Sequence, residues 1–279
     1  MEIKKMRVLA INDISCVGKC SLTTALPITS ACGVECNVLP TAILSTHTGG
    51  FTGYTFRDLT EDIGGILHHW KSLGLKFDYI VSGYLGSMAQ IDLVAEIKRE
   101  FLADGGKFIV DPVMGDAGRL YAGFTAEYVE KMRELCKEAD YILPNVTEAA
   151  FLADVPFPIT KKNAQKTLDK LLELCPMPIV TGIMDGEEIS IHFTDCKGSA
   201  NIIAHKNVEG AFHGAGDVFA AAFVGCLARG KSVAESIQLS SDFTVASIVR
   251  SAVEVPDKRY GLNFEMELFP FLEKLNSTK

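Results

Sequence analysis

The sequence has no long hydrophobic run and no cluster of basic residues. After the charged first residues, the first apolar run covers only 8–11, which is too short for a signal peptide or a membrane span. The formal net charge is −8, with 27 Lys and Arg against 35 Asp and Glu. This balance argues against nucleic acid or an anionic membrane as a partner. We expect a cytoplasmic protein that binds small molecules.

The cysteines lack the spacing of a metal site. Of the eight cysteines, Cys16 and Cys20 form one widely spaced pair, and Cys32 and Cys36 form another. Zinc sites usually use more closely spaced pairs, and the other cysteines and the six histidines share no spacing. We therefore expect free thiols that behave as small hydrophobic side chains in a reducing compartment.

Short apolar runs alternate with amphipathic stretches along all 279 residues. This alternation is typical of a mostly parallel sheet with crossover helices, and no linker divides the chain. We predict one α/β domain over residues 1–279. The expected strands are 8–11, 34–39, 79–81, 108–110, 141–143 and 179–180, and the expected helices are 63–73, 89–103, 125–138 and 161–174.

Two segments do not fit this alternation. Residues 39–56 are rich in Thr, Ser and Gly around His47, too polar for a core strand and too rich in glycine for a helix. We expect them to form a mobile flap over a substrate pocket. The runs 188–194 and 200–208 predict a hairpin, which we expect to cover the nucleotide.

The run His-Gly-Ala-Gly-Asp at 213–217 is the most informative motif, because an apolar stretch follows it directly. Gly214 and Gly216 allow a tight turn with converging amides, and a helix beginning at Asp217 would add its positive dipole end. A carboxylate there can take the proton of a hydroxyl that attacks a bound phosphate. The alternative is an ordinary glycine turn with an Asp N-cap.

Polar residues and glycines follow several expected strands at the point where each strand ends. In open α/β sheets the carboxyl ends of strands line the ligand site, so we expect these residues to converge on one cleft. Loop residues and helix caps are the alternative interpretation. The residues are Asn12, Asp13, Ser15, Ser82, Gly83, Tyr84, Asp111, Asn145, Thr181 and Gly182.

Residues 13–21 resemble a phosphate-binding Walker A loop, but two positions disagree. That motif needs glycine where Asp13 stands, and it needs Ser or Thr where Cys20 stands. We therefore reject a P-loop ATPase. Gly18 is better explained by close backbone approach at a helix start, with Asp13 or Ser15 facing the pocket.

Four motifs together resemble the pyridoxal kinases of the ribokinase-like superfamily, in the same order and spacing. They are Ser-Gly-Tyr-Leu-Gly-Ser at 82–87, Asp-Pro-Val-Met-Gly-Asp at 111–116, Pro144-Asn145 with Glu148, and Gly-Ala-Gly-Asp at 214–217. The resemblance covers nearly the whole chain. It implies a three-layer α/β/α fold with a mostly parallel central sheet and a small flap and hairpin over the site.

The resemblance also implies the residue roles. Asp217 would be the catalytic base, and Gly214, Ala215 and Gly216 the anion hole for the transferred phosphoryl group. The substrate contacts would be Asp13, Ser15, His47, Thr48 and Tyr84, with Tyr84 stacking on a pyridine ring. The nucleotide contacts would be Asp111, Asn145, Glu148, Thr181 and Gly182, and Asp111, Asp116 and Glu148 would hold Mg²⁺ directly or through water.

The implied reaction is transfer of the γ-phosphoryl group of Mg-ATP to the 5′-hydroxymethyl group of a vitamin B6 vitamer. The resemblance further implies a homodimer, and it leaves open the preferred vitamer and the need for a monovalent cation. Asp13 departs from the serine of many pyridoxal kinases. An acidic side chain there could pair with a protonated ring nitrogen or an amine, which would favour pyridoxamine.

Three alternatives remain beside this interpretation. A hydroxymethylpyrimidine kinase of thiamin synthesis would share the fold and base, but that family usually has a longer glycine-rich loop after its first strand. Sugar and nucleoside kinases would need an early Gly- and Asn-rich segment that residues 12–31 do not contain. A catalytically silent pyridoxal-binding protein would have no use for the base, the anion turn and the metal carboxylates together.

Overall fold

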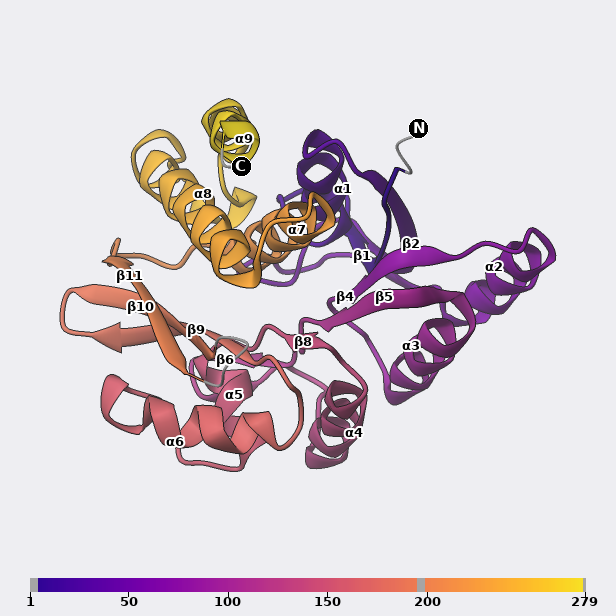
Figure 1. The fold of residues 1–279 in the computed structure, drawn as a ribbon, viewed down its shortest axis with the longest axis horizontal. Coiled ribbons are helices and arrows are strands. Elements are labelled where there is room, and N and C mark those ends of the chain that lie inside the picture. The colour runs from indigo at the N-terminus through magenta and orange to yellow at the C-terminus, as the bar shows by residue number, and fades with distance from the viewer. Residues whose placement is uncertain (1–4, 195–198, 278–279) are drawn as a thin grey trace. The chain divides into compact units, whose positions relative to one another are not determined.

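The computed structural model describes residues 5–194 and 199–277, and Figure 1 shows its elements. Two compact units divide the chain. Unit 1 comprises Met1–Val81, Glu100–Gly106 and Val208–Lys279, and unit 2 comprises Ser82–Arg99 and Lys107–Asn207. The prediction of one domain therefore stays a prediction. Within the described ranges, no helix is both long enough and apolar enough to cross a bilayer.

A six-stranded sheet has the strand order β3-β2-β1-β4-β5-β8. Strands β1 and β2 pair in parallel, as do β5 and β8, whereas β2 and β3 are antiparallel. The predicted α/β class with a mostly parallel central sheet is confirmed. The strands are β1 (Arg7–Ser15), β2 (Glu35–Leu44), β3 (Phe56–Asp58), β4 (Phe77–Ser82), β5 (Leu102–Val110) and β8 (Tyr141–Ile142).

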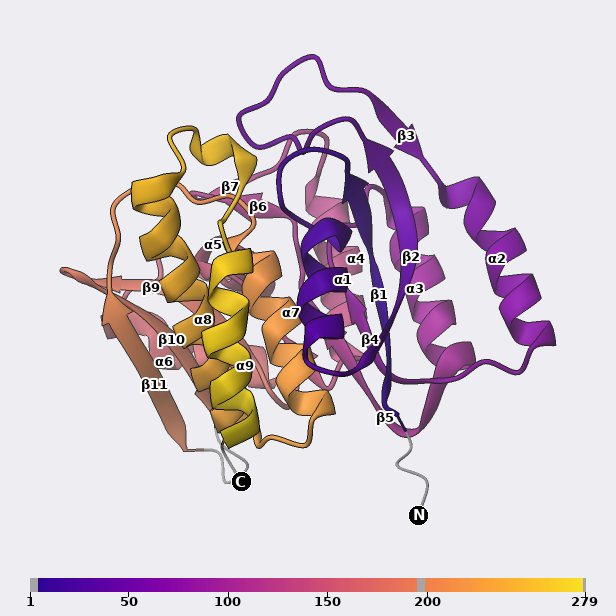
Figure 2. The same ribbon diagram turned by 90° about the horizontal axis from the view of Figure 1, so that it is seen from above.

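In unit 1, strands β1 and β2 lie between helices α1 (Leu22–Ala31) and α2 (Thr60–Ser72) (Figure 2). Residues 8–11 of β1 form a continuous apolar run because both faces of the strand are covered, and Val8 and Leu9 are completely buried. Helix α7 (Ala215–Ala228) is apolar all round, and every residue from Val218 to Ala228 is buried. It packs against α1 and α8 (Val233–Glu254) and so forms the helical core of this unit.

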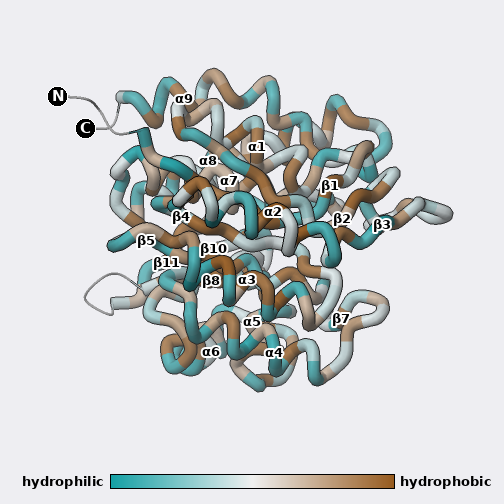
Figure 3. The backbone as a smooth tube through the Cα atoms, turned by 90° about the vertical axis from the view of Figure 1, so that its right-hand side faces the viewer, coloured by the Kyte–Doolittle hydropathy of each residue, from teal (hydrophilic) through white to brown (hydrophobic). Residues whose placement is uncertain are grey.

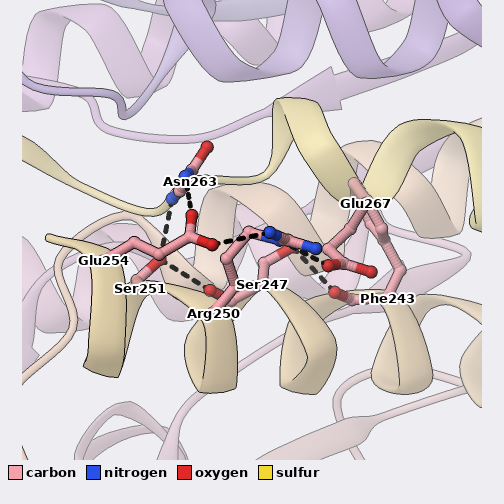
Figure 4. A network of polar contacts seen from close by, with 7 residues as sticks. All are labelled: Phe243, Ser247, Arg250, Ser251, Glu254, Asn263 and Glu267. Carbon is pink, nitrogen blue, oxygen red and sulfur yellow. Dashed lines mark hydrogen bonds and ion pairs between the residues drawn. The ribbon is translucent and has the colours of Figure 1, made fainter.

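The C-terminal residues dock on α8 through a polar network (Figure 4). Arg250 binds Glu267 at 2.6 Å and Glu254 at 2.7 Å, and the main-chain amide of Asn263 donates to Ser251 Oγ at 2.7 Å. Two short 3₁₀ helices, η1 (Lys258–Tyr260) and η2 (Glu265–Glu267), precede α9 (Leu268–Ser277). The network therefore holds the C-terminal residues that follow α8 against that helix.

Unit 2 contains amphipathic helices and a three-stranded antiparallel sheet of order β11-β10-β9. Hydrophobic and hydrophilic segments alternate around α4 and α6 in Figure 3, as expected for helices that bury one face. The elements are α3 (Met88–Phe101), β6 (Gly115–Asp116), β7 (Arg119–Leu120), α4 (Ala126–Lys137), α5 (Val146–Ala153), α6 (Lys161–Leu172), β9 (Ile179–Asp185), β10 (Glu188–Thr194) and β11 (Ala200–Lys206).

The prediction for residues 39–56 was partly wrong. Strand β2 continues through Leu44, and the buried residues Thr41 and Ala42 lie within it, so only 45–55 form a loop between β2 and β3. Pro40 and Thr41 make this stretch look like a loop in sequence. Pairing with β1 and β3 nonetheless satisfies the backbone hydrogen-bonding groups of this part of β2 and buries it.

Two further corrections concern element positions. Strand β9, predicted as part of the parallel sheet, pairs antiparallel with β10, and only isolated parallel bridges join its neighbourhood to the segment after β8. Helix α7 begins at Ala215 rather than at Asp217. The hairpin predicted at 188–208 is confirmed as β10 and β11, and the tip of its turn, 195–198, lies outside the described residues. All seven described cysteines are free thiols.

Candidate active site

Helix α7 begins with a left-handed glycine that places Asp217 in its first turn. Gly214 is the N-cap residue with φ +79°, and a Cβ atom there would overlap the main-chain oxygen of Lys19. Only glycine satisfies both requirements without strain. Ala215 and Gly216 are already helical, so the predicted turn is shorter than three residues. The free amides and positive dipole end of the helix point to the region before Asp217.

The Asp217 carboxyl group has a pKa raised to about 7. Burial is the main cause, and the charge of Asp13 adds to it. The main-chain amide of Ser21 and the side-chain amide of Asn12, which lies 3.5 Å from Asp217 Oδ1, act in the opposite direction. The side chain keeps partial solvent exposure. A carboxylate of this kind can accept a proton near neutral pH.

Asp13 is buried near the end of β1, and each of its carboxylate oxygens accepts a hydrogen bond. Ser15 Oγ donates to one carboxylate oxygen at 2.9 Å, and Ser21 Oγ donates to the other at 2.6 Å. The main-chain amide of Asp13 donates to Asn12 Oδ1 at 3.0 Å. Burial raises the pKa of Asp13, and the two hydroxyls oppose that rise. Unit 1 thus brings together the predicted residues Asp13, Ser15 and Asp217.

The His47 ring is held between two backbone segments. Its Nε2 lies 2.5 Å from the main-chain oxygen of Arg259, and its Nδ1 accepts the amide of Gly49 at 3.0 Å. A carbonyl oxygen can only accept, so Nε2 carries the proton. His47 is 7% exposed, whereas the predicted substrate contact Thr48 is exposed. Gly18 approaches this ring, and a Cβ there would overlap it, which explains the glycine in physical terms.

In unit 2, Asn145 and Glu148 form the capping box of α5. Asn145 Oδ1 accepts the amides of Thr147 and Glu148 at 2.8 and 3.0 Å, and Glu148 Oε2 accepts the amide of Asn145 at 2.9 Å. The alternative reading of these residues as helix caps is therefore correct in part. Asn145 Nδ2 also donates to the main-chain oxygen of Gly115 at 2.9 Å, which joins the box to β6.

The pKa of Glu148 is raised to about 8, mainly by burial and also by the nearby charge of Asp116. Glu148 Oε1 accepts the amide of Met114 at 3.2 Å. Asp116 is exposed, and its carboxylate accepts the amide of Ala117 at 2.7 Å. A cation near both carboxylates would offset their repulsion. Mg²⁺ is usually bound by one or two carboxylates together with the phosphates of a nucleotide. The Glu148 and Asp116 side chains therefore have the chemistry that Mg²⁺ ligands require.

Of the other residues predicted for the nucleotide side, Asp111 directly follows β5, as expected. Thr181 and Gly182 lie within β9 and do not follow a strand, because β9 continues to Asp185, so that part of the prediction was wrong. The amide of Asp111 donates to the main-chain oxygen of Ser82 at 2.9 Å, and the amide of Thr181 donates to that of Pro144 at 3.0 Å. In the described part of the chain, no three His, Cys, Asp or Glu side chains form a group that could hold a metal ion alone. Asp111, Asp116 and Glu148 therefore do not form such a group.

Two residues of unit 2 have environments that bear on ligand contact. Gly182 has φ +83° and nothing within 4 Å of a Cβ position, so its surroundings are open. The half-buried ring of Tyr84 stacks on Phe124, with centroids 5.9 Å apart, and Phe124 stacks on Tyr128 at 3.9 Å. At least one face of Tyr84 therefore contacts protein. Convergence of the residues of both units on one cleft stays a prediction.

Two residues that make contacts in the site were not predicted from the sequence. Ser21 contacts both Asp13 and Asp217, and the main-chain oxygen of Arg259 accepts a hydrogen bond from His47 Nε2. Ser21 lies in the segment that was compared with a Walker A loop, and nothing in that comparison pointed to its hydroxyl. The contact of Arg259 is made by the backbone, which carries no residue signature. Only the fold could reveal these contacts.

Comparisons with known proteins show the family of this chain. The profile of the phosphomethylpyrimidine kinase family matches residues 27–262. A crystal structure of a candidate phosphomethylpyrimidine kinase from Bacteroides thetaiotaomicron has a TM-score of 0.92 and 32% identity, covering 97% of this chain and 95% of that one. The chain belongs to the phosphomethylpyrimidine kinase family. It is a kinase with the ribokinase-like fold, as the four sequence motifs implied.

Other relatives of the kinase are pyridoxal kinases. The crystal structure of pyridoxal kinase from Lactobacillus plantarum has a TM-score of 0.89 and 31% identity, covering 96% of this chain and 97% of that one. A pyridoxal kinase of Rubrobacter xylanophilus is 28% identical over 225 residues, which are 75% of this chain and 77% of that protein. The resemblance to pyridoxal kinases is thus confirmed at the level of the whole chain.

Proposed function

We propose that the kinase transfers the γ-phosphoryl group of Mg-ATP to the 5′-hydroxymethyl group of a vitamin B6 vitamer. The observation that carries this proposal is the Asp217 carboxyl group, whose pKa is about 7, in the first turn of a helix that begins at a left-handed glycine. The similarity to the Lactobacillus plantarum pyridoxal kinase supports the substrate class. A second crystal form of the Bacteroides thetaiotaomicron protein, 32% identical, contains pyridoxal.

Asp217 is the group that we assign as the base. The substrate hydroxyl gives its proton to the Asp217 carboxylate as its oxygen bonds to the γ-phosphorus, and the bond from that phosphorus to the bridging oxygen of ADP breaks. The amides at the start of α7 stabilise the charge that develops on the transferred group. Because the pKa is near 7, the base is charged and active at slightly alkaline pH.

Asp13, Ser15 and His47 are the residues that we assign to the vitamer. Asp13 is 5% exposed and both of its oxygens already accept hydroxyl groups, so any further contact must use their remaining lone pairs. We assign Thr48 and Tyr84 as peripheral contacts of the vitamer. Exposure of Thr48 and stacking of Tyr84 within the protein support weaker roles for them.

On the nucleotide side, we assign Asp111, Asn145, Glu148, Thr181 and Gly182 to ATP. Glu148 and Asp116 are the residues that would hold Mg²⁺, which neutralises phosphate charge when bound. The contribution of Asn145 is to orient Glu148 through the capping box. A role for Asp111 in metal binding, a homodimer, a monovalent cation and a cytoplasmic location are further parts of the proposal.

A coupled assay of ADP release tests the proposed function. Pyridoxal, pyridoxamine, pyridoxine and hydroxymethylpyrimidine are offered separately with Mg-ATP. We expect turnover of at least one B6 vitamer, with kcat/KM above that for the pyrimidine. Turnover of the pyrimidine alone would assign the kinase to thiamin synthesis. Ligand binding without any turnover would favour a silent pyridoxal-binding protein.

A further inference from the structure

Ser21 has a backbone conformation that serine rarely adopts. The residue precedes α1 with φ +53° and ψ −134°, a region in which glycine is favoured. A serine before a helix normally has extended backbone angles and accepts an amide of the first turn through its side chain. Ser21 makes no such side-chain cap. The stability of α1 therefore does not explain this conformation.

The contacts of Ser21 offer a different explanation. Its hydroxyl donates to Asp13 Oδ1 at 2.6 Å, and its main-chain amide donates to the carboxylate of Asp217. The residue is 6% exposed, so water competes little for either contact. One strained residue thus connects a carboxylate at the end of β1 with a carboxylate in the first turn of α7. Strained backbone is typical of functional sites.

We propose that Ser21 is a positioning residue for phosphoryl transfer, whose hydroxyl bond to Asp13 holds its backbone in the strained conformation that directs its amide at Asp217. The inference rests on the assignment of Asp217 as the base. Without the bond to Asp13, the backbone relaxes toward the ordinary region and the amide turns away. The carboxylate then loses a donor that stabilises its charged form and fixes its orientation.

The direction of the resulting pH shift is specific. Asp217 is faced by Asp13 and Asn12 from β1 and by the thiol of Cys20, whose pKa burial raises to about 12, so that it stays neutral in the assay range. Loss of the Ser21 amide raises the pKa of Asp217 and moves the acid limb of kcat to higher pH. Loss of charge on Asp13 alone would move that limb to lower pH.

Ser21→Ala and Ser21→Gly separate the backbone from the hydroxyl, because both remove the hydroxyl and only glycine adopts this conformation freely. For Ser21→Ala we expect kcat to fall about tenfold or more, with the acid limb at higher pH and little change in the KM for ATP. For Ser21→Gly we expect kcat within about threefold of the parent. A structural role for the hydroxyl would affect both variants equally.

Thr23→Ala is the matched control, because Thr23 Oγ1 donates to the main-chain oxygen of Cys20 at 2.7 Å in the same turn. The inference would be overturned if kcat fell equally in the two Ser21 variants, or if Ser21→Ala changed kcat no more than Thr23→Ala does. It would also be overturned if the acid limb of kcat in Ser21→Ala stayed at the same pH or moved to lower pH. If Ser21→Ala does not fold, a tenfold loss of kcat in Ser21→Gly overturns the inference.

Asp217→Asn is measured in parallel. Full activity of that variant would refute the base itself, whereas its inactivity beside an unaffected Ser21→Ala would refute only the role of Ser21.

Discussion

The two units each contain a carboxyl group with a raised pKa, and the two groups are held differently. Asp217 in unit 1 has one main-chain amide and one distant side-chain amide, and it keeps partial exposure. Glu148 in unit 2 is 3% exposed and accepts three main-chain amides. The first arrangement leaves room for proton exchange with a ligand, and the second fixes a carboxylate in place. Similar pKa shifts therefore accompany different chemistry.

Asp217→Asn should have the largest effect, because it removes the proposed base. We expect kcat at pH 8 to fall about 100-fold or more with little change in ATP affinity. In the parent enzyme kcat should fall as pH drops below about 7, where the carboxylate becomes protonated. Asp62→Asn is the control, since Asp62 occupies the equivalent first-turn position of α2 and is exposed. A parent pH profile that is flat between 6 and 8 would contradict the role of Asp217.

Glu148→Gln tests whether the fixed carboxylate serves a metal ion. Glutamine keeps an oxygen for the capping box but lacks the charge, so we expect the Mg²⁺ concentration for half-maximal activity to rise about tenfold. Titration of activity with Mg²⁺ measures this. Glu235→Gln is the matched control, because Glu235 occupies the same position in the capping box of α8. An equal Mg²⁺ requirement in both variants would exclude Glu148 from the metal site.

Gly214→Ala should destabilise the fold through the turn that precedes Asp217. Its positive φ and the overlap with Lys19 oxygen together should lower the free energy of unfolding by about 2 kcal/mol or more. Gly216→Ala is the comparison, because Gly216 is helical and has nothing within 4 Å of its Cβ position. Urea unfolding of both variants measures the difference. Equal stabilities would show that α7 does not need a left-handed N-cap residue.

The smallest effect expected is a gain in stability for Asp217→Asn. The pKa of this acid is raised from 3.8 to about 7 on folding, so the unfolded state binds fewer protons between these values and stability falls as pH rises through them. Asparagine removes that cost. The gain in unfolding free energy should be about 1–3 kcal/mol at pH 8 and smaller at pH 5. A gain that is larger at pH 5 would contradict the raised pKa.

Local pattern predicted some elements well and others poorly. Helices α4 and α6 end within two residues of their predicted limits, because their apolar residues recur at helical spacing. Strand β2 extends five residues further than predicted, through Leu44, because burial of Thr41 depends on neighbouring strands and not on its own polarity. For helix α1 only a start near Gly18 was predicted and no residue range, since Pro27 lies inside it and its apolar pattern is weak.

The α/β alternation, the Gly-Ala-Gly-Asp motif and the family to which they point could be recognised in the sequence, because they depend on residue types at short spacing. The folded structure was needed to show that Ser21 joins Asp13 to Asp217 and that His47 donates to Arg259. It also decided which carboxyl groups have raised pKa values. Burial, strain and charge proximity depend on which groups the fold brings together, in some cases from positions more than 200 residues apart, and no local pattern records them.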